Sequence, residues 1–266
     1  MHSLNLKGLT AEQCREIIPL HTILLGYRGS VAHGMYRNPE HHEDGIDDKD
    51  LLGVCIAPLS VYWGMDRFEQ RERMLNEWDV VVYELRKMVG LLAKGNPNVL
   101  ALLWLEEHHY LIRHPLGMRL IEQRDLFVSR QAYHSFVGYA HGQLKRMTRF
   151  GEGAYATGYM GAKRKALVEK FGYDTKNAAH LIRLLRMGIE LLREGRLIVQ
   201  RPDAPQLMEI KLGHWTLEQV KTEADHLFKR AEAAYDACAW PHAPDHDTLN
   251  ALCVGILNDF WHPDSA

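Results

Sequence analysis

The fold is decided by residues 22–34, TILLGYRGSVAHG, and residues 47–56, DDKDLLGVCI. Each stretch contains a short apolar run that predicts a β-strand. A third strand is predicted for residues 79–84, DVVVYE, because β-branched residues are common in strands. A helix is expected ahead of these strands over residues 11–18, where Thr10 can serve as its N-cap. The N-terminal part of the chain is therefore expected to form a small sheet with helices around it.

The turns and strand ends of this sheet carry the polar residues of a candidate site. Gly29 and Ser30 follow the first strand, and backbone N–H groups in such a small-residue turn can hold phosphate oxygens. Asp48 and Asp50 begin the second strand and are separated by one residue, so their side chains point to the same face. Two carboxylates so placed repel each other unless a cation lies between them, and Mg²⁺ or Mn²⁺ suits oxygen ligands.

A third carboxylate commonly completes a site of this kind. Asp79, at the start of the third strand, is the preferred candidate. Glu77 lies on the same face as Asp79 and is the alternative, whereas Glu84 lies on the opposite face. Each element has an ordinary explanation: Gly-Ser as a plain turn, the acidic run of residues 44–50 as a solvated loop, and Asp79 as a strand-end turn residue. The order of these elements along the chain therefore carries more weight than any one of them.

Helical patterns dominate beyond Pro115. The expected division is therefore an α/β domain over residues 1–112 and a helical domain over residues 113–266. The helices are predicted over residues 129–149, 161–170, 175–194, 217–236 and 247–260.

The middle of the chain is basic. Residues 113–201 contain 17 Lys and Arg against 7 Asp and Glu, whereas the whole chain has a formal net charge of −2. Such a segment favours a triphosphate or a nucleic acid as partner, although basic helix faces in water would give the same composition. The candidate phosphate-binding residues are Lys163, Lys176, His180 and Arg183, together with His33 close to the Gly-Ser turn.

The composition argues against several other classes. The four cysteines are far apart and form no Cys-x-x-Cys pair, so neither a disulfide framework nor a common zinc site is expected. Adjacent histidines such as His41 and His42 point apart and are poor chelators. No apolar run approaches the length of a membrane span, and no signal sequence is evident, so a cytoplasmic protein without membrane contact is expected.

The segments GYRGSVAHG, DDKDLLGV and DVVVYELRKMVGLLAKGNPN together resemble the nucleotidyltransferase superfamily of DNA polymerase β. The similarity is closer to a bacterial and phage branch of predicted nucleotidyltransferases, some linked with RNA repair. GYDTKNAAHLIRLLRMGIELLREG resembles the helical C-terminal part of that branch, so the resemblance covers residues 20–215. It implies an α+β fold, in which an N-terminal nucleotidyltransferase fold with a small mixed sheet flanked by helices precedes a C-terminal helical domain.

The resemblance also implies roles for individual residues. Gly29 and Ser30 match the motif that binds the triphosphate, Asp48 and Asp50 match the metal-binding pair, and Asp79 matches the third carboxylate. The implied reaction uses two Mg²⁺ or Mn²⁺ ions to transfer a nucleoside monophosphate from an NTP to a hydroxyl, with release of pyrophosphate. The expected acceptor is an RNA or other nucleic-acid end.

Departures from the pattern and two alternatives remain. Arg28 precedes the Gly-Ser motif, the loop to Asp48 is long and contains histidines, and Asp47 stands where a serine is common. The acceptor could instead be a protein or small-molecule hydroxyl. The chain could also be a non-catalytic module that binds nucleotide or nucleic acid, although such a module has no need for a repulsive cluster of carboxylates. The preferred base and the oligomeric state are not encoded in any of these motifs.

Overall fold

The computed structural model describes residues 6–42, 49–148 and 162–263, and only the backbone at residues 148 and 162–166. The fold is α+β, as predicted: a five-stranded mixed sheet with flanking helices is accompanied by a set of long helices.

Two compact units make up the chain. Unit 1 comprises residues 1–128 together with residues 243–266, and unit 2 comprises residues 129–242. The domain boundary expected after residue 112 stays a prediction; the division into compact units falls after Val128.

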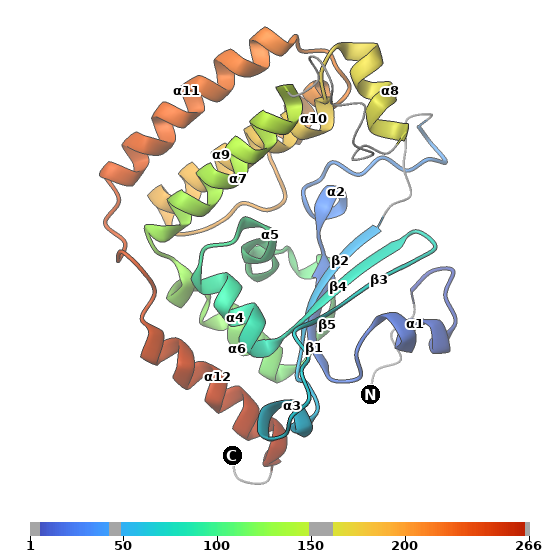
Figure 1. The fold of residues 1–266 in the computed structure, drawn as a ribbon, viewed down its shortest axis with the longest axis vertical. Coiled ribbons are helices and arrows are strands. Elements are labelled where there is room, and N and C mark those ends of the chain that lie inside the picture. The colour runs from blue at the N-terminus through green and yellow to red at the C-terminus, as the bar shows by residue number, and fades with distance from the viewer. Residues whose placement is uncertain (1–5, 43–48, 149–161, 264–266) are drawn as a thin grey trace. The chain divides into compact units, whose positions relative to one another are not determined.

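The sheet of unit 1 has the strand order β3-β4-β2-β1-β5 (Figure 1). β2 and β4 pair in parallel, and every other neighbouring pair is antiparallel. This parallel pair lies in the middle of the sheet. The start of β2, which contains Asp50, is therefore beside the start of β4, which contains Asp79. The strands are β1 (Thr22–Tyr27), β2 (Lys49–Cys55), β3 (Gln70–Leu75), β4 (Trp78–Glu84) and β5 (Tyr110–Arg113).

Both faces of the sheet are covered by helices. On one face Leu25, Leu51 and Val80 are buried against α1 (Ala11–Ile17), which begins at a capping box between Thr10 and Gln13. On the other face lie α4 (Leu85–Ala93) and α6 (Pro115–Glu122) (Figure 1). The remaining helices of unit 1 are α2 (Gly29–Ala32), α3 (Leu59–Trp63), α5 (Pro97–Leu100) and α12 (His246–Trp261), with 3₁₀ turns at Ala101–Trp104, Glu107–His109 and Arg124–Phe127.

Unit 2 is built around α9 (Thr175–Glu194). This helix packs against its neighbours through residues on most of its circumference, including Leu181 and Leu185, which are almost fully buried. It begins at Asp174, whose side chain accepts from the backbone N–H of Asn177, and it ends at Gly195, which has a φ of 69°. The neighbours are α7 (Gln131–Thr148), α8 (Ala162–Phe171), α10 (Ala204–Lys211) and α11 (Leu217–Asp236).

The long helices do not have the character of membrane spans. Within the described ranges, no helix combines the length and the apolar composition that crossing a bilayer requires. The cytoplasmic location expected from the sequence stays a prediction.

Candidate active site

Asp50 and Asp79 lie beside each other at the beginning of the two parallel strands. In the pairing of β2 with β4, Asp50 is opposite Asp79 and Lys49 is opposite Trp78. Residues opposite each other on neighbouring strands point to the same face of the sheet, and the strands are about 4.8 Å apart. Both carboxylates therefore emerge on one face, where both residues are partly exposed.

Gly29 brings the Gly-Ser turn into contact with this pair. Its φ is 63°, in the left-handed region that glycine adopts readily, and a Cβ built on it would overlap with the Asp50 carboxylate. The backbone N–H of Arg28 donates to the carbonyl oxygen of Asp50 at 2.9 Å, which fixes the end of β1 beside the start of β2. Only a residue without a side chain fits between this backbone and Asp50.

Ser30 and His33 lie on the short helix α2 that follows. Ser30 is partly exposed in its first turn, and its carbonyl oxygen accepts from the backbone N–H of Met35 at 2.8 Å. His33 is only 6% exposed and ends the helix. This burial favours a packing role for His33, and its expected contact with phosphate stays a prediction.

Arg28 makes an ion pair that the sequence analysis did not anticipate. Its Nη2 lies 2.9 Å from Oδ2 of Asp79, and the two side chains are 30% and 29% exposed. The Nε of Arg28 is buried and has no hydrogen-bond partner among the described residues. The available signal was a cation directly before the Gly-Ser turn, but sequence alone does not show which carboxylate it reaches.

Glu77, the alternative third carboxylate, has a different partner. It lies just before β4, and its Oε1 is 3.7 Å from Nζ of Lys49. Lys49 neighbours Asp50 in the strand and so points to the opposite face, where its ammonium lies over the Trp78 ring. This geometry favours Asp79 over Glu77 as the companion of Asp50.

Glu84, at the other end of β4, is a structural residue. It is 3% exposed, accepts from the Tyr62 hydroxyl at 2.8 Å and caps α4 by accepting from the backbone N–H of Lys87. Burial, together with the charge of Glu84, raises the pKa of the nearby Cys55 thiol to about 12 and that of Cys253 to about 11. These thiols are therefore protonated at neutral pH and are poor nucleophiles or metal ligands.

The donor set suits a hard divalent cation. Asp50 and Asp79 present carboxylate oxygens on one face, and the glycine turn packs directly against the Asp50 carboxylate. Asp48, the other predicted ligand, lies outside the described residues. Within the part of the chain that the structure describes, no group of three His, Cys, Asp or Glu side chains is gathered closely enough to hold a metal.

The remaining predicted residues belong to unit 2. Lys163 lies on α8, in a part of that helix where side chains are not described. Lys176, His180 and Arg183 recur every three or four residues on α9 and are exposed or partly exposed, so they share one stripe of the helix. Arg183 is partly exposed as a residue, but its guanidinium is buried. This burial, with the charge of Arg201 as a lesser cause, lowers the pKa of Arg183 to about 9, which leaves it protonated at neutral pH.

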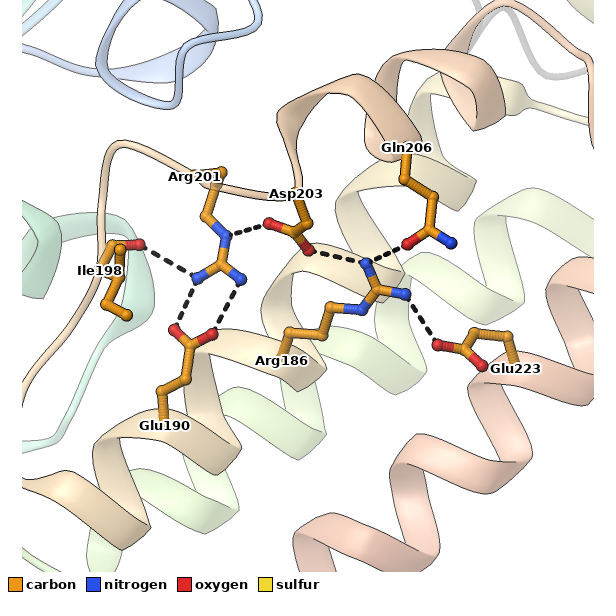
Figure 2. A network of polar contacts seen from close by, with 7 residues as sticks. All are labelled: Arg186, Glu190, Ile198, Arg201, Asp203, Gln206 and Glu223. Atoms are coloured by element: carbon orange, nitrogen blue, oxygen red, sulfur yellow. Dashed lines mark hydrogen bonds and ion pairs between the residues drawn. The ribbon is translucent and has the colours of Figure 1, made fainter.

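Glu190 lies on the same stripe, seven residues after Arg183, and belongs to a network of ion pairs (Figure 2). Arg201 binds both carboxylate oxygens of Glu190, at 2.6 and 2.8 Å, and donates through Nε to Asp203 at 2.7 Å. Asp203 also accepts from Arg186, which reaches Glu223 on α11 at 2.8 Å. Acidic partners thus compensate Arg186 of α9 and Arg201 beyond its end, and the N-terminal half of α9 carries the cations of the predicted phosphate-binding set.

A comparison with protein families identifies the class of protein. Fold and sequence together define a nucleotidyltransferase of the DNA polymerase β superfamily. The chain belongs to the RlaP family, described as the RNA repair pathway DNA polymerase beta family, whose sequence model matches residues 6–254. No match is found among curated proteins. A crystal structure of a nucleotidyltransferase-like protein from Exiguobacterium sibiricum 255-15 is similar with 13% identity and a TM-score of 0.29, over 86% of this chain and 75% of that chain.

Proposed function

We propose that this protein is a metal-dependent nucleotidyltransferase that transfers a nucleoside monophosphate from an NTP to the hydroxyl of an RNA end and releases pyrophosphate. The observation that carries the proposal is the direct pairing of Asp50 with Asp79 on one face of the sheet, with Gly29 packed against the Asp50 carboxylate.

Each part of the site has a role in the proposed reaction. Asp50 and Asp79 would hold divalent metal, with Asp48 as the further ligand expected from its position two residues before Asp50. Bound Mg²⁺ or Mn²⁺ would neutralise charge on the phosphates and activate the attacking hydroxyl. Gly29 and Ser30 would receive the triphosphate through backbone N–H groups and the serine hydroxyl. Asp79 would orient the acceptor hydroxyl and take up its proton.

Two observations support RNA as the acceptor. The family is described by its link to an RNA repair pathway. Lys176 and Arg183 also place positive charge on one stripe of α9, suited to a phosphate backbone. Lys163 is kept as a further candidate contact from its position in the basic segment.

The proposal is tested by incubating purified protein with Mg²⁺ or Mn²⁺, each labelled NTP in turn, and RNA of defined ends. Label should appear on the RNA with release of pyrophosphate, and EDTA should abolish the reaction. The Asp50→Asn variant should be inactive, and the Glu77→Gln variant should retain activity.

Two results would contradict the proposal. Labelling of a protein or small molecule but of no RNA would show that the acceptor is wrong and would leave the metal chemistry standing. Nucleotide or RNA binding that persists unchanged in Asp50→Asn, with no transfer to any acceptor, would identify a non-catalytic binding module.

A further inference from the structure

Within the described residues, the guanidinium of Arg28 has a donor group without a hydrogen-bond partner. Of its donor groups, one contacts Asp79 at 2.9 Å, and its buried Nε has no partner among the residues that the structure describes. A buried donor without a partner is costly, and arginine offers five N–H donors in a fork that matches phosphate oxygens. Arg28 is also the residue directly before Gly29 and Ser30, where the triphosphate is proposed to bind.

We propose that Arg28 is a phosphate-binding residue that exchanges partners: it neutralises Asp79 while metal is absent and binds the triphosphate once metal occupies the carboxylates. This inference rests on the proposed function. The Arg28 guanidinium is placed to offset the repulsion between Asp79 and Asp50, which lie beside each other on β4 and β2.

Metal and arginine would compete for the negative charge of Asp79. The Arg28 guanidinium, whose Nη2 lies 2.9 Å from Oδ2 of Asp79, would repel a cation held by the same carboxylate. When a metal–triphosphate complex arrives, the metal supplies the positive charge that Asp79 requires. The released guanidinium then has its nearest new anion in the phosphates above the Gly-Ser turn.

Binding measurements separate the two halves of this exchange. The first probe is Mn²⁺ alone, and the measured quantity is the fraction of Mn²⁺ bound. The second probe is inorganic tripolyphosphate with Mg²⁺, which has no nucleobase and so removes any effect of base preference. Arg28→Met should bind Mn²⁺ alone roughly two- to fivefold more tightly than the wild type, since a partly exposed ion pair no longer competes. The same variant should bind tripolyphosphate about 10- to 100-fold more weakly, because it cannot form a charge-assisted hydrogen bond to the phosphates. Arg28→Lys should lie between the two.

Arg119→Met is the matched control. Arg119 is 29% exposed, is ion-paired to one aspartate, Asp259, and belongs to the same unit. It lies on α6, which packs near Ile23 at the other end of β1 from Arg28. This variant should leave both binding constants unchanged, and thermal melts of every variant establish that it is folded.

The outcomes distinguish this inference from the proposed function. If Asp50→Asn abolishes Mn²⁺ binding but Arg28→Met behaves like Arg119→Met with both probes, the exchange is wrong and the function stands. If Arg28→Met weakens binding of Mn²⁺ and tripolyphosphate alike, Arg28 only supports the local fold, and the exchange is again wrong. If neither probe binds the wild type and Asp50→Asn changes nothing, the proposed function itself fails.

Discussion

The carboxylate of Asp50 lies directly over the Cα of Gly29, so that a Cβ at this position would come within 3.1 Å of Asp50 Cγ and would overlap with its oxygen. The contact joins the end of β1 to the start of β2 and holds the Gly-Ser turn beside the carboxylates. Glycine is therefore required here for two separate reasons, its left-handed φ of 63° and the absence of a side chain.

Replacement of Gly29 by alanine should damage both the fold and the site. The left-handed conformation alone should lower the free energy of unfolding by about 1–2 kcal/mol. The overlap should in addition displace Asp50 and abolish metal-dependent turnover. Thermal unfolding and the nucleotidyl transfer assay measure the two effects. Gly90→Ala is the control, because Gly90 is exposed within α4 with open space around its Cα, and alanine there should stabilise the helix. Full activity in Gly29→Ala would contradict the proposed arrangement.

The two carboxylates of the site should behave alike, and Glu77 should not. Asp50→Asn and Asp79→Asn should each reduce turnover by about 100-fold or more, because metal coordination contributes several kcal/mol to transition-state stabilisation. Glu77→Gln removes only an ion pair with Lys49, 3.7 Å away, and should change turnover by less than about threefold. Steady-state rates at saturating Mg²⁺ make the comparison. A large decrease in Glu77→Gln with a small one in Asp79→Asn would reverse the choice of third carboxylate.

The ion-pair network of unit 2 should be important for stability. The Arg201 side chain is 2% exposed and holds Glu190 and Asp203 together (Figure 2). Arg201→Met leaves Glu190 without its cation and Asp203 with Arg186 alone, and should cost about 3–5 kcal/mol of unfolding free energy. Arg196→Met, at an ion pair with Glu194 whose arginine is 66% exposed, should cost less than about 1 kcal/mol. Equal melting temperatures for the two variants would show that the network contributes nothing specific.

Asp203 should make this stability depend on pH. Burial acts to raise the pKa of Asp203, but hydrogen bonds from Arg201 and Arg186 outweigh burial and lower the pKa below its ordinary value of 3.8. A lowered pKa in the folded state stabilises the fold above the pKa of the unfolded state, and the contribution disappears as pH falls through the lowered value. The difference in unfolding free energy between wild type and Asp203→Asn should thus be constant from pH 7 to about 5 and shrink below about pH 4. Denaturant titrations across this range test the trend, and a difference that grows at low pH would contradict it.

Much of the fold follows from the sequence where apolar residues are periodic. The long helices α7, α9 and α11 were predicted to within two residues, and Thr10 has the predicted role as N-cap. The edge strands β3 and β5 were not predicted. β3 (Gln70–Leu75) is largely polar because it lies at the edge of the sheet, and β5 (Tyr110–Arg113) has only four residues. Neither gives the alternating or apolar pattern of a buried strand.

The site was predictable only in part, for a different reason. Spacing in one strand places side chains on the same face, but it does not determine which strands are neighbours. The pairing of Asp50 with Asp79 depends on the parallel register of β2 and β4, which are separated in sequence by another strand and a helix. The same register brings Asp79 within reach of Arg28. Long-range strand pairing is set by the whole sheet, so a motif read along the chain cannot supply it.

RNA binding should depend on Lys176 and Arg183 in the N-terminal half of α9 and not on Arg193 in its last turn. Lys176→Met and Arg183→Met should each weaken binding of a single-stranded RNA and reduce the slope of log K against log salt by roughly 0.7 for every phosphate that the variant no longer neutralises. Arg193 lies in the last turn of the same helix and is exposed, so Arg193→Met removes an equal charge away from the proposed RNA-binding residues and should leave the slope unchanged. Fluorescence anisotropy at several salt concentrations yields the three slopes. Equal reductions in all three variants would mean that RNA senses only the net charge of the unit, and the stripe would then have no specific role in acceptor binding.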